Sequence, residues 1–66
     1  MSQNLTVTES RIVSLIANKG LTNAEISAAL GCSEKTIKVH VSNVFRKMNV
    51  SNRVKLALTY HGLLEQ

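Results

Sequence analysis

Apolar residues along this chain recur at the spacing of one face of an α-helix. The longest such stripe begins at Ile37 and continues at Val41, Val44, Phe45 and Met48. Shorter stretches of the same kind precede and follow it, and no segment alternates between apolar and polar residues as a half-buried strand would. The pattern therefore predicts an all-α chain with helices at about residues 7–19, 23–30, 34–48 and 52–61.

Polar residues that cap helices stand at the predicted starts. In a capping box, the side chain of the cap accepts a bond from the backbone three residues on, and an acidic residue there bonds back. Thr6 and Glu9 have this spacing. The same pair of residue types recurs at Thr22 and Glu25. The remaining two helices are preceded by further cap residues: Ser33, and either Ser51 or Asn52. Each cap contributes roughly 1 kcal/mol, so the starts are specified locally.

Residues that tolerate a left-handed backbone stand at the predicted helix ends. They are Gly20, Gly31, Asn49 and Gly62. The connection at Gly31 and Cys32 joins the short helix 23–30 to the longer helix 34–48. A short helix, a tight turn that contains glycine and a longer helix make up the helix-turn-helix motif. The predicted fold is therefore an all-α, four-helix, helix-turn-helix domain.

The chain has 66 residues and corresponds to a single domain, 1–66. A domain of this size has a marginal core, and a pocket that enclosed a substrate would use much of it. His40 and His61 have no second metal ligand at helical spacing. We therefore expect a binding module and not an enzyme, with no catalytic residue, metal site or cofactor.

The single cysteine, Cys32, fits a reducing compartment, and we interpret it as a small core residue and not as a redox switch. The chain has neither a secretory signal nor an apolar run of the roughly 20 residues that span a bilayer. We therefore expect a cytoplasmic protein that does not contact a membrane.

Positive charge is concentrated in the second half of the chain. Residues 1–34 carry two basic and three acidic side chains, whereas residues 35–66 carry six basic and one acidic. A concentrated positive field suits a polyanionic partner such as nucleic acid. The alternative is a basic surface that is merely solvated.

The side of the predicted helix 34–48 opposite its apolar stripe is mostly polar and basic. It carries Lys35, Val39, Ser42, Asn43 and Arg46, with Lys38 and Lys47 on its flanks. Lysine can donate to guanine, serine and asparagine can bond base edges or phosphates, and an apolar group can touch a thymine methyl. An exposed Val39 among lysines therefore has a use in a DNA major groove. Arg46 and Lys47 would rise toward the DNA backbone, and His40 would contact a phosphate or Asn43.

The stretches LTNAEISAALGCSEKTIKVHVSNVFRKMNV and NRVKLA carry a specific family likeness. From Leu5 to about His61 the chain resembles the LuxR/FixJ/NarL, or GerE-type, helix-turn-helix domain, a winged-helix-like superfold without a wing. The resemblance implies a transcriptional regulator that binds a specific double-stranded DNA site with its third helix in the major groove.

The resemblance also implies contacts with DNA for the residues of this chain that match the motif of the family. The resemblance implies that Lys38, Val39 and Ser42 face the bases, although the Ser42 position varies within the family. It implies contacts to the DNA backbone from Thr22, Asn23, Ser33, Lys35, Thr36, Asn43, Arg46 and Lys47. Many members have proline where this chain has Val7, which matters little after a capping box. Members commonly carry a sensor domain as well. We therefore expect either a fragment of a longer regulator or a stand-alone member, and the position of Met1 shortly before Leu5 favours the stand-alone member.

The fourth predicted helix has two apolar faces. Val54, Ala57 and Leu58 are expected to pack in the core. The second face carries Leu56, Tyr60 and Leu63, with Leu64 beside them. A helix that is apolar on two sides needs two partners. We therefore predict a homodimer in which this second face pairs with another copy, as the resemblance also implies. The alternative is that Leu56 and Tyr60 pack on the first helix.

Two rival functions remain open at this stage. The chain could be a protein-interaction module that pairs with full-length LuxR-type regulators, in which case Leu56 and Tyr60 would matter and Lys38 would not. It could instead bind RNA polymerase, because the promoter-reading region of a sigma factor shares this helix pattern.

Overall fold

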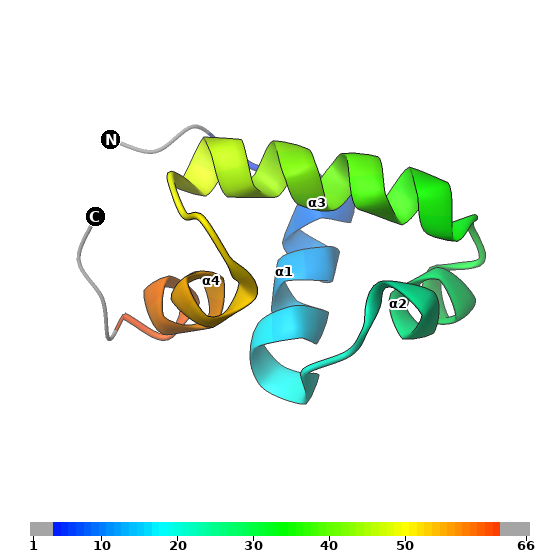
Figure 1. The fold of residues 1–66 in the computed structure, drawn as a ribbon, viewed down its shortest axis with the longest axis horizontal. Coiled ribbons are helices and arrows are strands. Elements are labelled where there is room, and N and C mark those ends of the chain that lie inside the picture. Colours follow the sequence, from blue (N-terminus) through cyan, green and yellow to red (C-terminus); the bar gives the residue numbers. More distant parts are fainter. Residues whose placement is uncertain (1–3, 63–66) are drawn as a thin grey trace.

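The computed structural model describes residues 4–62, which form four helices and the loops between them (Figure 1). The helices are α1 (Val7–Lys19), α2 (Asn23–Leu30), α3 (Glu34–Met48) and α4 (Arg53–Tyr60). Residues 4–62 contain no strand, which agrees with the all-α prediction. None of these helices is both long enough and apolar enough to cross a membrane.

The helix starts are capped by side chains close in sequence. The Thr6 hydroxyl accepts from the Glu9 backbone at 3.1 Å, and the Glu9 carboxylate accepts from the Thr6 backbone at 2.9 Å. An equivalent capping box begins α2. The Ser33 hydroxyl caps α3. The side-chain oxygen of Asn52 accepts from the backbone of Lys55 at 2.8 Å, which makes Asn52, not Ser51, the cap of α4.

Helix α3 lies across the other three helices, and α1 lies between α2 and α4 (Figure 1). One stripe of α3 supplies Ile37, Val41, Val44 and Met48 to the core. The other helices supply Ile12, Val13, Ile16, Ile26 and Leu56. Because the core lies on one side of α3 alone, the opposite side of this helix is available to a partner.

The turn between α2 and α3 depends on glycine. Gly31 has φ of 73°, in the left-handed region, and its backbone N–H donates to the carbonyl of Ser27 at 2.9 Å. No atom lies within 4 Å of the position a Cβ would take there, so the backbone conformation alone disfavours a side chain.

We therefore expect Gly31→Ala to lower the free energy of unfolding by about 1 kcal/mol, the cost of a left-handed residue with a Cβ. Urea denaturation followed by circular dichroism measures this change. Asn49 has φ of 57° at the end of α3, so Asn49→Gly is the matched control and should raise stability. Equal stability of Gly31→Ala and the wild type would contradict the expected strain.

The predicted assignment of the two faces of α4 was wrong. Leu56, predicted at a dimer interface, is 0% exposed and packs in the core, whereas Val54, predicted in the core, is 69% exposed. Ala57 and Leu58 are half-buried. Both faces are apolar, so periodicity alone did not determine which one turns toward α1. Tyr60 remains 44% exposed, and Leu63 lies outside the described residues.

Candidate nucleic-acid interface

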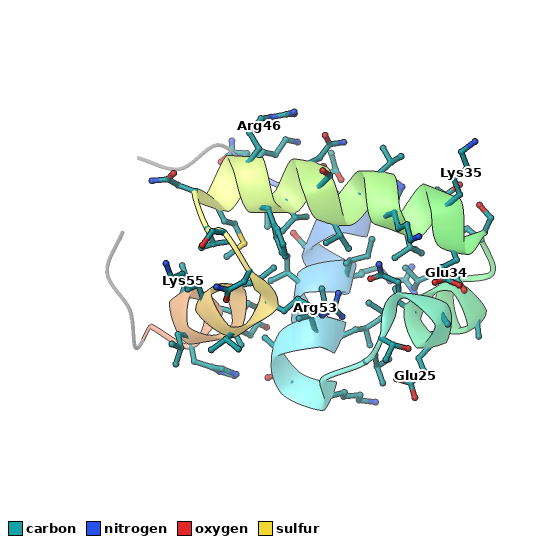
Figure 2. The ribbon with its side chains drawn as sticks, viewed as in Figure 1. Glu25, Glu34, Lys35, Arg46, Arg53 and Lys55 are labelled. Atoms are coloured by element: carbon teal, nitrogen blue, oxygen red, sulfur yellow. The ribbon has the colours of Figure 1, made fainter. Side chains whose placement is uncertain are left out.

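The outer side of α3 brings together most of the side chains that were predicted to touch DNA. Those that are exposed along it are Lys35, Lys38, Val39, Ser42 and Arg46. Figure 2 shows Lys35 and Arg46, near the two ends of α3, projecting away from the other helices. His40 and Asn43 are partly buried at the edges of this surface. The described part of the chain therefore leaves the three predicted base-facing residues uncovered.

Val39 is 56% exposed in the middle of this surface. Lys38 and Ser42, both exposed, stand one position before it and three positions after it. An apolar side chain in such a position gains nothing from water, but it fits against a thymine methyl. The surface thus combines a cation, an apolar group and a hydroxyl within one turn of helix.

The cap residues add hydroxyl groups at the starts of α2 and α3. The Thr22 hydroxyl accepts from the backbone of Glu25 at 3.2 Å, and the Ser33 hydroxyl accepts from the backbone of Thr36 at 3.1 Å. The hydroxyls of Ser33 and Thr36 also lie 2.9 Å apart. A hydroxyl that accepts at a cap keeps its own O–H as a donor. One of the hydroxyls of Ser33 and Thr36 donates to the other, so the second of this pair and the Thr22 hydroxyl can donate to an anion near the positive end of a helix dipole.

Arg53, which the sequence interpretation did not assign, connects α4 to the start of α2. Its guanidinium donates to the side-chain oxygen of Asn23 at 3.0 Å and to the carbonyl of Leu21. One sequence signal pointed to it: Arg53 begins α4, and a cation is unfavourable at the N-terminus of a helix. The partners lie about thirty residues away, so they could not be read from spacing. Arg53 fixes the position of Asn23, one of the predicted contacts to the DNA backbone.

Lys47 has a partner inside the protein. Its ammonium donates to the Glu9 carboxylate at 2.8 Å, and the two side chains are 20% and 4% exposed. This hydrogen bond to Lys47, and a second one from the backbone of Thr6, lower the pKa of Glu9 below its ordinary value of 4.5, although burial opposes the shift. The pair joins the start of α1 to the last turn of α3. A contact between Lys47 and DNA would have to compete with this bond.

The outer side of α4 carries an apolar groove against α1. Its volume is about 380 Å³, and its lining consists of five apolar or small residues and one cation: Ile16, Gly20, Val54, Ala57, Leu58 and Arg53. Beyond it, Nε2 of the His61 imidazole lies 3.2 Å from the carbonyl oxygen of Ala17, a contact between the end of α4 and α1. Of the residues predicted for the dimer interface, Leu56 is therefore absent from the outer surface of α4, whereas Tyr60 remains exposed.

A comparison with known protein families shows to which family this chain belongs. Residues 3–60 match the family model described as bacterial regulatory proteins, luxR family. The chain belongs to the luxR family. This confirms the likeness inferred from the sequence, and the four-helix architecture agrees with it. The luxR family consists of DNA-binding regulators of transcription, and it is not a family of enzymes.

Several luxR-type relatives are similar over most of this chain. The uncharacterized transcriptional regulatory protein YhcZ of Bacillus subtilis (strain 168) is 50% identical over 54 residues, which is 82% of this chain and 25% of YhcZ. The transcriptional regulatory protein LiaR of the same organism is 41% identical over 59 residues, which is 89% of this chain and 28% of LiaR.

A third relative is a nitrate/nitrite response regulator. This protein, NarP of Escherichia coli (strain K12), is 43% identical over 42 residues, which is 64% of this chain and 20% of NarP. The chain thus spans between 20% and 28% of the length of these three relatives.

Proposed function

We propose that this luxR-type domain binds a specific site on double-stranded DNA by placing the outer side of α3 in the major groove. The observation that carries the proposal is the exposure of Lys38, Val39 and Ser42 on the side of α3 opposite its core stripe. A major groove about 12 Å wide admits one α-helix, so a surface confined to a single helix fits it. The role that follows is regulation of transcription.

Affinity and sequence choice would come from different groups. Lys35 and Arg46 are exposed cations that can neutralise phosphates and release counterions, which makes binding sensitive to salt. Contacts to the backbone orient the domain, whereas contacts to base edges select the sequence. We assign the selection to Lys38, Val39 and Ser42.

We further propose that two copies associate through α4. The support is the exposed Val54 beside the half-buried Ala57 and Leu58, which together offer a second copy a small apolar contact surface. Tyr60 is also exposed, at 44%, and can still contribute. A two-fold dimer would present its two α3 helices to half-sites about 10 base pairs apart. Sedimentation of the free protein at high loading tests the association.

Substitution of Lys38 separates base contacts from backbone contacts. We expect Lys38→Ala to reduce affinity for the selected site by roughly 1–3 kcal/mol and to relax the preference at one base pair. Lys35→Ala, at a predicted backbone contact, should weaken all duplexes alike. Selection from a random duplex pool, followed by titration of the wild type and both variants at several salt concentrations, measures these effects.

The same experiment distinguishes the rival functions. Equal losses on selected and random duplexes for both variants would show that Lys38 does not read bases. A wild-type domain that prefers no duplex, but pairs with a full-length luxR-type regulator through Val54, would favour the protein-interaction module. Duplex binding that required RNA polymerase would favour the polymerase-binding alternative.

A further inference from the structure

A cleft lies between the end of α3 and the first turn of α4. Its volume is about 330 Å³. Its lining consists of Phe45, Arg46, Asn49, Val50, Ser51 and Lys55. Arg46 and Lys55 supply two cations, whereas Asn49 and Ser51 supply an amide and a hydroxyl that can donate hydrogen bonds. No acidic residue lines the cleft, so its chemistry suits an anion with several acceptor oxygens.

The two cations have no carboxylate to neutralise them within residues 4–62. The three acidic residues of that range are Glu9, Glu25 and Glu34. Glu9 is buried and bound to Lys47. Figure 2 shows Glu25 and Glu34 at the opposite end of the molecule from Lys55. An anion that entered the cleft would therefore meet no competing negative charge from the described part of the chain.

The cleft is continuous with the outer side of α3. Arg46 follows Ser42 by four residues, one turn of helix, and it is exposed on the same side. Arg46 lies eight residues beyond Lys38, which corresponds to about 12 Å along the helix axis. The major groove is also about 12 Å wide, so a helix with Lys38 among the bases carries Arg46 to the edge of the groove. In the proposed docking, a phosphodiester of the strand that borders the groove would lie there.

We propose that this cleft binds a phosphodiester of the same duplex, with Lys55 as a contact to the DNA backbone outside the helix-turn-helix motif. The inference rests on the proposed function, because it requires α3 to lie in the major groove. It adds α4 to the interface, with Lys55 as the cation that α4 supplies to the cleft. Free inorganic phosphate offers the same acceptor oxygens as a DNA phosphodiester, so the experiment below distinguishes these two ligands.

The test compares two variants in which an exposed lysine is replaced by uncharged glutamine. Lys55→Gln removes the cation from the cleft, whereas Lys19→Gln removes a charge from the C-terminal end of α1, the end that lies farthest from α3 in Figure 1. Both variants change the net charge by the same amount. Dissociation constants for a selected duplex are measured between 50 and 200 mM salt, on the order of the range where counterion release dominates.

We expect Lys55→Gln to reduce the slope of log affinity against log salt by about 0.9, the value for one lost phosphate contact. Lys19→Gln should leave the slope unchanged. Circular dichroism melting should show both variants folded, since the side chain of Lys55 is exposed.

Three outcomes would overturn the proposal. Equal slopes for Lys55→Gln, Lys19→Gln and the wild type would remove Lys55 from the interface while leaving the proposed function intact. Saturable binding of inorganic phosphate that depends on Lys55, with an unchanged slope on DNA, would make the cleft a site for free anions. A wild-type domain that binds no duplex would overturn both this inference and the proposed function.

Discussion

Leu56→Ala is expected to lower the free energy of unfolding by about 2–5 kcal/mol, because it leaves a cavity in the core. Leu56 is 0% exposed and is the residue of α4 that is fully buried against the core. A domain of this length is stabilised by only roughly 3–10 kcal/mol in total. The substitution should therefore remove a large share of the total stability. Urea denaturation followed by circular dichroism measures the loss.

Val54→Ser is the matched control on the same helix. Val54 is 69% exposed, so its replacement should change stability by no more than about 0.5 kcal/mol, as at other surface positions. If two copies associate through the outer side of α4, Val54→Ser should weaken that association while the domain stays folded. A fully folded Leu56→Ala variant that had lost self-association would instead restore Leu56 to the interface.

Lys47→Ala is expected to lower the free energy of unfolding by about 2 kcal/mol, because it leaves a buried carboxylate without its cation. The Glu9 side chain is 4% exposed, and its bond to Lys47 joins α1 to α3. The double variant Glu9→Gln, Lys47→Met removes both charges and keeps their approximate shapes. It should regain most of the loss. A Lys47→Ala variant as stable as the wild type would show that the pair contributes nothing.

The same pair makes stability depend on pH. Folding lowers the pKa of Glu9 below its ordinary value of 4.5, so the folded state binds this proton less tightly than the unfolded chain. The contribution of Glu9 is therefore complete at neutral pH and is lost as the pH falls from about the ordinary value through the lowered one. Lys47→Ala should flatten this part of the acid denaturation profile.

The sequence predicted the helices well because their determinants are local. The cap of α1 and its partner, Thr6 and Glu9, are three residues apart, and so are Thr22 and Glu25. The exposed side of α3 was predictable for a related reason. A single apolar stripe that begins at Ile37 leaves one possible outer surface, with Val39 in its middle.

Features that depend on tertiary packing were not predictable in the same way. α4 is apolar on two sides, and the choice between Val54 and Leu56 depends on how the helix turns against α1. Arg53 reaches Asn23 across 30 positions, and Lys47 reaches Glu9 across 38. These polar bonds join segments whose relative placement is known only from the fold.

The short reach of the capping bonds bears on how the chain acquires its structure. Each cap joins residues three apart, so a helix can nucleate without a search for a distant partner. Helical domains dominated by such local contacts fold in microseconds to milliseconds. Bonds made after the rate-limiting step mainly retard unfolding. We expect the long-range bonds of Arg53 and Lys47 to form after that step, so that the caps govern the speed of folding and these two residues slow unfolding.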